Sequence, residues 1–218
     1  MRLSRRAWLA GSAALLASRA SRAAGAAAPI DDLLARIARA RAPVKTLQGP
    51  FTQTRTIGLL STDVKSTGTL SLLRPDRLKW QLAAPDEVTF WIGPEGLAYR
   101  SAHGQGRVPA SNARIAASLQ DLHALLGGDL AKLTERWSLA VLRDDATGAE
   151  LEATRRPEAA DAGAGASVAR TMRFALAPDL VRPTRALLVE GEHDRTVIEF
   201  GTLTVDAALD EATMRPPV

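Results

Sequence analysis

The sequence predicts one large, mostly antiparallel β-sheet with an amphipathic helix before it and one or two helices in its middle. Between residues 47 and 108, and again after residue 137, short runs rich in Thr, Val, Leu, Phe and Trp alternate with turn residues, as strands joined by tight turns do. The connections are too short for the helical crossovers of a βαβ fold. A sheet of about ten strands has to curl or close to protect its edges, and the helices are available to cover its mouth.

The first helix is expected over residues 30–42, because apolar residues recur there at helical spacing. Two aspartates favour its N-terminal end and Pro43 ends it. The apolar positions are Ile30, Leu33, Leu34 and Ile37. The opposite face is rich in arginine, which predicts an amphipathic helix at the surface.

The remaining elements follow from the same signals. The first strands are expected over residues 47–57, 64–74, 77–84, 87–93 and 96–101. A mid-chain helix over residues 112–126 ends at Gly127-Gly128, and a short helical piece over 129–136 follows it. Later strands are expected over residues 137–143, 149–155, 168–177, 183–191 and 195–205, and the low-complexity segment 157–167 is expected to be a loop.

Residues 1–26 have the pattern of a cleaved export signal. A basic start precedes a short apolar run, and Ala24-Gly25-Ala26 offers a small-residue cleavage site. Arg5 and Arg6, followed by Ala7-Trp8-Leu9, resemble the twin-arginine signal of bacteria, and an ordinary Sec signal that contains two arginines is the alternative. The apolar run is about half the ~20 residues that a spanning helix needs. We therefore expect export to the periplasm, and a single domain over residues 27–218.

Charge and cysteine content exclude several classes of function. The chain has 28 Lys and Arg against 24 Asp and Glu, and five arginines lie in residues 1–26, which leaves a net charge of −1 for the rest. The basic character of the whole chain therefore belongs to the export signal, and no basic stripe with aromatic residues indicates nucleic-acid binding. The absence of cysteine excludes disulfides, thiol catalysis and Cys-bound metals.

The sequence contains no recognisable catalytic motif. His103, His123 and His193 are not at metal-ligand spacing, and no G-x-S-x-G elbow is present. Gly104-Gln105-Gly106 lacks the third glycine and the helix of a phosphate-binding loop. We therefore expect neither an enzyme nor a metal or cofactor.

Strand alternation predicts an apolar inner face. Leu70, Leu72 and Arg74 share one face of their strand, and alternate residues of the next two strands are apolar. A plain packed core explains this pattern, and so does an apolar cavity, because only nine aromatic residues are available to fill a sheet of this size. An inward arginine needs hydrogen-bond acceptors. Arg74 therefore either snorkels to water or pairs with an acid such as Asp76.

The order of several short motifs resembles the outer-membrane lipoprotein carrier family, the LolA-like proteins. These motifs are the amphipathic helix, Leu47-x-x-x-Phe51-x-Gln53, a strand ending in Arg74-Pro75, Leu78-x-Trp80, Pro85-x-Glu87, the Leu122-Leu125-Leu126-Gly127 pattern and the tail Leu209–Pro217. The resemblance spans nearly the whole chain after the export signal. Gly93-Pro94-Glu95-Gly96 replaces the family's common Asp-Gly turn, and Phe and Tyr are scarce.

The resemblance implies a mainly β fold with an α lid, namely an incomplete antiparallel β-barrel of about 10 to 11 strands covered by two or three helices around an apolar cavity. In that family the arginine of the Arg-Pro pair holds the lid shut, so Arg74 is the expected lid latch. The acyl-binding cavity is expected to include Phe51, Leu70, Leu72, Leu78, Trp80, Leu82, Val88, Phe90, Ile92, Leu119 and Leu122.

The function that the resemblance implies is a monomeric periplasmic carrier without catalytic activity. It is expected to take acylated lipoproteins or other acylated lipids from an inner-membrane transporter and deliver them to an outer-membrane acceptor. The alternative is an envelope regulator with a related barrel that binds a membrane-protein partner. Such regulators carry a second domain, for which this chain has no room.

Overall fold

The structure is a computed structural model, and it describes residues 30–58, 62–109, 121, 123, 125–126, 130–157 and 169–217. Its first strands are β1 (Thr46–Ile57), β2 (Thr62–Leu73), β3 (Arg77–Leu82), β4 (Thr89–Gly93), β5 (Gly96–Ser101) and β6 (Gly104–Pro109). The later strands are β7 (Trp137–Asp145), β8 (Gly148–Arg155), β9 (Thr171–Leu176), β10 (Pro183–Val189), β11 (Arg195–Phe200) and β12 (Thr204–Val205). The helical elements are α1 (Ile30–Arg41), α3 (Ala131–Thr134) and the 3-10 turn η2 (Glu211–Met214).

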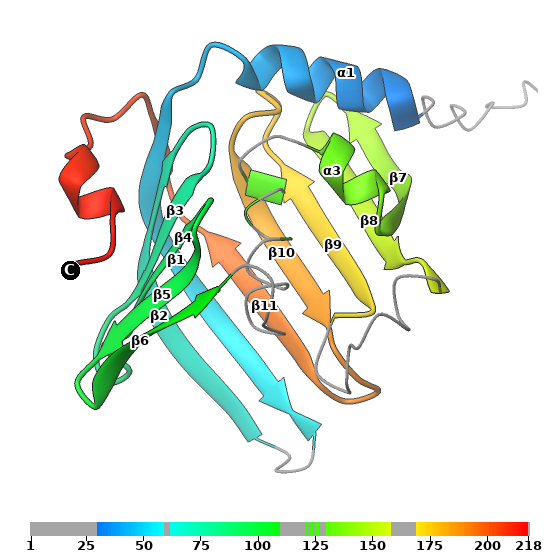
Figure 1. Ribbon diagram of the computed structural model, residues 1–218. Coiled ribbons are helices and arrows are strands. Elements are labelled where there is room, and N and C mark those ends of the chain that lie inside the picture. Colours follow the sequence, from blue (N-terminus) through cyan, green and yellow to red (C-terminus); the bar gives the residue numbers. More distant parts are fainter. Residues whose placement is uncertain are drawn as a thin grey trace, which may run out of the picture.

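All twelve strands belong to one antiparallel sheet in the order β6-β5-β4-β3-β2-β1-β11-β10-β9-β8-β7, with β12 paired to β1. The sheet curls so that the limb β1–β6 and the limb β7–β11 face each other, and α1 lies across one end (Figure 1). β6 and β7 are the two edges and do not pair, so the sheet is not closed. The expectation of an antiparallel sheet is confirmed, with twelve strands instead of ten or eleven.

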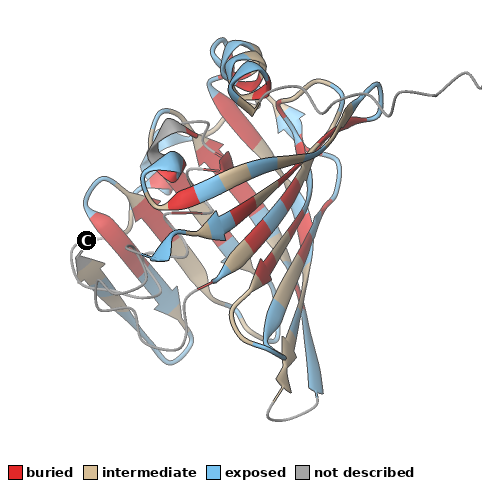
Figure 2. Ribbon diagram, turned by 90° about the vertical axis from the view of Figure 1, so that its right-hand side faces the viewer, coloured by how far each residue is buried: buried red, intermediate tan, exposed pale blue. Residues whose placement is uncertain are grey.

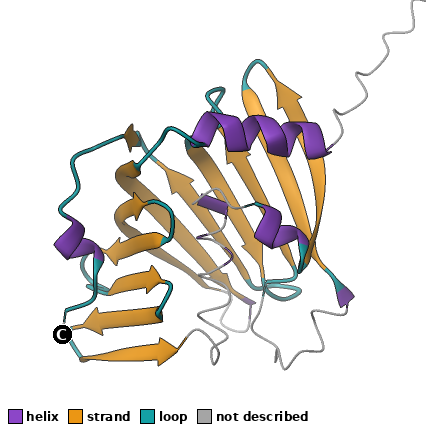
Figure 3. Ribbon diagram, turned by 45° about the horizontal axis from the view of Figure 1, so that its top comes forward, coloured by secondary structure: helices purple, strands orange, loops and turns teal. Residues whose placement is uncertain are grey.

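The expected two or three covering helices are not borne out. Among the described residues, α1 is the one α-helix longer than about a turn, and Figure 3 shows it lying across the strand ends. Of the mid-chain helix expected over residues 112–126, four residues are described, and all four are helical. The piece expected over residues 129–136 shortens to the four residues of α3.

Register and alternation place the apolar residues on the inner face. Phe51 of β1 lies opposite Gly68 of β2 and Phe200 of β11, and Gly68 in turn lies opposite Leu82 of β3. Because side chains alternate along a strand, every second residue from these positions shares their face. Burial is greatest beneath α1 and declines toward the turn between β1 and β2 (Figure 2).

Gly68 allows the inner aromatic cluster to sit close to the sheet. A Cβ at this position would lie 2.5 Å from Cζ of Phe51 and would also meet the carbonyl oxygen of Gln81. Neither group can move away freely, because Phe51 is buried and the Gln81 carbonyl belongs to the neighbouring strand β3. The backbone of β2 therefore forms the floor on which the Phe51 ring rests.

We expect Gly68→Ala to lower the free energy of unfolding by about 1–3 kcal/mol, because the added methyl group overpacks the space beneath Phe51. Chemical denaturation with and without the substitution measures this loss. Gly191→Ala is the matched control, because its Cβ would come no closer than 3.3 Å to the flexible carboxylate of Asp194. Equal stability of the two variants would contradict the packing described here.

Candidate functional site

Most of the inner-face residues that were expected to line an acyl cavity belong to one continuous buried core. Those in the core are Phe51, Leu70, Leu72, Leu78, Trp80 and Ile92, and Leu82 and Phe90 pack against it while partly exposed. Val88 is half-buried. Leu119 and Leu122 lie outside the described residues. The structure therefore brings most of the expected residues together on one apolar surface, and it shows that surface packed.

Three aromatic rings mark the centre of this surface. The ring centroids of Phe51 and Trp80 are 3.8 Å apart with a 31° angle between the planes. Phe200 meets Trp80 edge-on, with the centroids 6.3 Å apart. Phe200 comes from β11, on the far side of β1 from Trp80, so the cluster joins the two limbs of the sheet. Phe200 was not predicted as a site residue, because the sequence of residues 195–205 does not show which strand they pair with or in which register.

Helix α1 is fixed to the second limb by an ion pair. Nη1 of Arg36 donates to Oδ2 of Asp144 at 2.7 Å, and Nη2 donates to Oδ1 at 3.1 Å. Such a two-pronged pair fixes orientation as well as distance. Asp144 lies in β7, and its side chain is 9% exposed. Below this contact, Leu33 and Ile37 are completely buried, so one face of α1 seals the end of the sheet.

Arg41, the last residue of α1, is a buried cation that joins three segments. It is 1% exposed. Its Nη1 donates to the carbonyl oxygen of Leu125 at 2.7 Å, and its Nε donates to the carbonyl oxygen of Leu180 at 3.2 Å. Leu125 is one of four described residues of the mid-chain stretch, 121, 123, 125 and 126, and we call these four residues the lid segment. Leu180 lies between β9 and β10. Arg41 therefore ties α1 to the lid segment and to the second limb.

Burial makes this arrangement electrostatically costly. Burial, assisted by repulsion from Arg74, lowers the pKa of Arg41 to about 9, while Asp179 acts in the opposite direction. The guanidinium therefore stays charged at neutral pH. The carboxylate of Asp179 accepts hydrogen bonds from Arg182 and from the backbone of residue 181. Among the described residues, Nη2 of Arg41 has no hydrogen-bond partner.

Arg74 directly follows β2, and the alternation along β2 points it to the inner face. Its backbone N–H donates to the carbonyl of Lys45, which places it beside the end of α1. Its Nε is buried and has no hydrogen-bond partner among the described residues, and burial lowers the pKa of its guanidinium. Among the described residues, the bond to the lid segment that was expected from Arg74 is made by Arg41.

A detectable sequence signal for Arg41 existed. Leu33, Ile37 and Arg41 are spaced four residues apart, so they lie along one stripe of α1. The arginines of this helix were predicted to lie on its exposed face. That prediction is correct for Arg39, which is exposed, and wrong for Arg41, which is buried. The position of Arg41 at the C-terminal end of the apolar stripe therefore indicates that its side chain is buried and needs hydrogen-bond acceptors.

A second buried ionic contact anchors the lid segment at its other described end. Asp121 is 1% exposed and forms an ion pair with Arg136, which lies between α3 and β7. Burial raises the pKa of the Asp121 carboxyl group, and the charge of Arg136 counteracts this. Arg155 lies over the neighbouring Trp137 ring, 5.8 Å from its centroid. The lid segment is thus held to the second limb by Asp121 and to α1 by the carbonyl of Leu125.

The described part of the chain offers no grouping of His, Cys, Asp and Glu suited to a metal ion. None of the helices within the same residues is long and apolar enough to cross a membrane.

The family whose description reads "Outer membrane lipoprotein carrier protein LolA" matches residues 42–213 of this sequence. The chain belongs to the LolA family. The match covers all twelve strands of the open sheet and ends within η2, and it leaves α1 outside. No curated protein matches the chain in sequence.

Several solved structures are similar to this chain. The LolA superfamily protein NE2245 from Nitrosomonas europaea is 12% identical, with a TM-score of 0.45 and coverage of 85% of this chain and 97% of that one. Lipoprotein LppX from Mycobacterium tuberculosis is 16% identical, with a TM-score of 0.45 and coverage of 84% and 99%. The MucA/MucB complex of Pseudomonas aeruginosa gives 17% identity, a TM-score of 0.47 and coverage of 85% and 60%.

We expect Arg41→Met to loosen the lid segment selectively. Loss of two hydrogen bonds from a charged donor, each worth about 1.5–3 kcal/mol, should speed amide exchange around Leu125 by tenfold or more. The global free energy of unfolding should change less, because the substitution also removes a buried charge. Hydrogen exchange with mass spectrometry measures the first quantity, and chemical denaturation measures the second.

Arg39→Met is the matched control, because Arg39 lies in the last turn of the same helix and is exposed. It should leave exchange around Leu125 unchanged. Unchanged exchange in Arg41→Met as well would show that the guanidinium does not hold the lid segment.

The raised pKa of Asp121 predicts a pH-dependent difference between wild type and Asp121→Asn. A carboxyl group with a higher pKa in the folded state binds its proton more tightly when folded, so its contribution to stability improves as pH falls. The Tm of wild type minus that of Asp121→Asn should therefore rise between pH 7 and pH 4. Thermal unfolding of both proteins across this range tests the sign, and a falling difference would contradict the burial of Asp121.

Proposed function

We propose that this protein is a periplasmic carrier that binds the acyl chains of lipoproteins, or of other acylated lipids, on the inner face of its sheet. The observation that carries the proposal is the apolar inner face beneath α1, closed by a breakable contact from Arg41 to the carbonyl of Leu125. The description of the family names the same kind of cargo. The proposed route runs from an inner-membrane transporter to an outer-membrane acceptor, with the protein acting as a monomer and without catalysis.

The energetics favour a closed carrier that cargo can open. Each buried CH₂ group contributes about 0.8 kcal/mol, so one long acyl chain represents on the order of 10 kcal/mol of apolar burial. Opening the lid segment requires the loss of the Arg41 bond to Leu125, which is worth about 1.5–3 kcal/mol, and of the contacts that bury Leu125 and Leu126. Cargo can replace those apolar contacts, whereas water cannot.

The acyl chain would lie against the aromatic cluster of Phe51, Trp80 and Phe200. In the closed protein, Leu125 and Leu126 belong to the same core as these rings. Displacement of the lid segment would expose the surface from this side, so cargo would take the place of the two leucines. Leu119 and Leu122 stay predicted members of the same surface.

Arg74 stays a proposed latch residue. The alternation along β2 directs its side chain to the inner face beside the end of α1, and among the described residues its Nε has no hydrogen-bond partner. Arg74 would assist Arg41 in holding the lid segment when cargo is absent.

The test is native mass spectrometry of the lipid-stripped protein with a triacylated lipopeptide, beside the same peptide without acyl chains. Wild type should bind one acylated peptide and none of the unacylated one. Arg41→Met should retain the acylated peptide about tenfold or more tightly, because closure no longer competes with cargo. Arg74→Leu in the same series reports whether Arg74 shares the latch, and Arg39→Met should behave as wild type.

Equal binding of the acylated and unacylated peptides would overturn the carrier proposal. If no variant binds either peptide and a membrane protein of the envelope is retained without lipid, the regulatory alternative replaces it. If all variants bind acylated peptide equally, the carrier function stands and the latch assignment is wrong.

A further inference from the structure

The outer face of β3–β6 is crossed by the C-terminal strap, residues 211–217, which consists of η2 and the residues after it. Trp91 of β4 faces outward and donates from Nε1 to the carbonyl of Thr213 at 3.0 Å. Met214 is 2% exposed, and Arg107 of β6 donates to the carbonyl of Pro217 at 3.3 Å. The strap is therefore a fixed part of this face, on the side of the sheet away from the proposed cargo surface (Figure 1).

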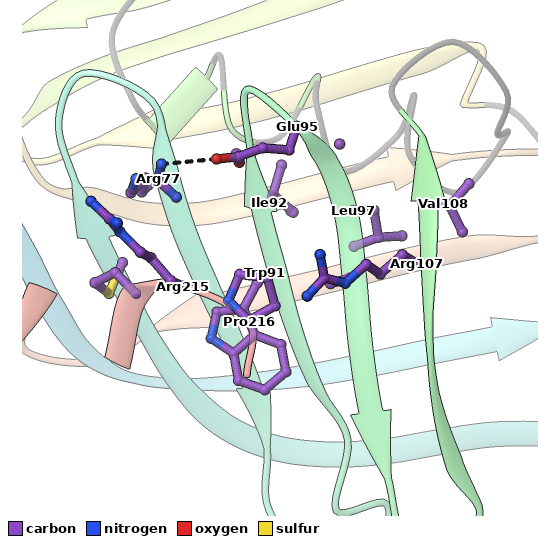
Figure 4. Close-up of a pocket in the computed structure, with 13 residues that line it drawn as sticks. Arg77, Trp91, Ile92, Glu95, Leu97, Arg107, Val108, Arg215 and Pro216 are labelled. Atoms are coloured by element: carbon purple, nitrogen blue, oxygen red, sulfur yellow. Dashed lines mark hydrogen bonds and ion pairs between the residues drawn. The ribbon is translucent and has the colours of Figure 1, made fainter. Parts of the chain in front are cut away.

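A cavity of about 300 Å³ lies between the strap and the strands, and three arginines border it. Arg77 comes from β3, Arg107 from β6 and Arg215 from the strap (Figure 4). The floor includes Trp91, which is largely buried by the strap. Three separate elements thus direct guanidinium groups to one concave site.

Two further hollows of about 170 and 690 Å³ adjoin this cavity around Trp91 and add Arg100 and Lys79. Across the three hollows the charged lining residues are Arg77, Lys79, Arg100, Arg107 and Arg215 against Glu95 and Glu211. Glu95 is paired with Arg77, whose Nη2 lies 3.1 Å from its Oε1. The uncompensated charge is therefore positive, although residues 27–218 together carry a net charge of −1.

We propose that this outer face binds the phosphate groups of anionic phospholipids and docks the protein reversibly on a membrane surface. Phosphate is the group that arginine recognises best, through parallel hydrogen bonds from its planar fork. The cations come from β3, β5, β6 and the strap, so they spread over one broad face of the sheet.

The apolar residues of this face favour docking over insertion. Trp91 lies beneath the strap, and Met214 of the strap is buried against the sheet. Among the described residues that line the three hollows, Tyr99 is the one large side chain with an apolar ring that is exposed, so cations dominate this face. Attraction of this kind is reversible and falls with salt, because it acts over about a Debye length. Docking leaves the inner face free, and the proposal does not depend on the identity of the cargo.

The test is co-sedimentation with vesicles of phosphatidylcholine alone and with 30% phosphatidylglycerol. Wild type should bind the anionic vesicles at 20 mM salt and be released at 300 mM, with no binding to the neutral ones. Arg107→Gln combined with Arg215→Gln should weaken binding roughly 30-fold, as removal of two surface cations predicts. Arg185→Gln combined with Arg195→Gln is the charge-matched control, because both residues are exposed on the outer face of β10 and β11, and it should weaken binding less than about threefold.

Four results would overturn the proposal. Equal losses in the two double variants would show a general charge effect, and equal binding to neutral vesicles would show apolar insertion. Saturable binding of inorganic phosphate without vesicle binding would reduce the site to a free-anion pocket. Binding of polyglutamate without vesicle binding would assign the face to an acidic protein partner.

Discussion

One buried guanidinium connects the helix, the lid segment and the second limb of the sheet. Arg41 ends α1, and its hydrogen bonds to the carbonyls of Leu125 and Leu180 connect that helix to the lid segment and to the second limb. Within the described residues no carboxylate forms an ion pair with Arg41. Such a buried cation gives weak support to a fold, because its desolvation offsets much of the free energy that its hydrogen bonds contribute. The guanidinium instead fixes the relative positions of three segments. Its hydrogen bonds to the two carbonyls are directional, whereas the contacts of an apolar residue of equal volume would not hold α1 and the lid segment in one register.

The curled sheet separates two surfaces of opposite chemistry. Strand alternation sends Phe51 and Trp80 inward and Lys79 and Trp91 outward from neighbouring positions. The inner face is apolar and lies under helices, whereas the outer face near β4 is cationic and crossed by the C-terminal strap. Because the same strands build both faces, the proposed membrane contact at the outer face would leave room for the proposed cargo at the inner face.

Much of this fold follows from local sequence signals. The strands β1 to β5 and β7 to β10 lie close to their predicted ranges, because Gly and Pro turns bound runs of strand-forming residues. β6 was not predicted, because Gly104 and Gly106 have low strand propensity. In the structure Gly106 pairs with Tyr99 of β5 and lies against its ring, so contact with the neighbouring strand explains this glycine. The run 195–205 was predicted as one strand, and Gly201, packed against Pro50, divides it into β11 and β12.

The site was less predictable than the fold, since it rests on contacts between distant segments. The apolar inner residues were found from alternation, but the placing of Phe200 beside Trp80 depends on the pairing of β11 with β1. The choice between Arg74 and Arg41 depends on which guanidinium reaches the lid segment, and 84 residues separate Arg41 from Leu125. No local pattern encodes that distance, although the stripe of Leu33, Ile37 and Arg41 shows which face of α1 is buried.

The packed inner face has a consequence for transfer of cargo. A permanently open apolar cavity would bind an acyl chain with the full gain of its burial, on the order of 10 kcal/mol, and release would be slow. Here Leu125 and Leu126 already occupy part of the same core, so a cargo of the proposed kind would exchange one set of apolar contacts for another. Its net affinity would be the difference between the two sets, reduced further by the loss of the Arg41 bond to Leu125. The proposed carrier must both accept and surrender the same cargo, and a lid that competed with cargo for one surface would keep that difference small.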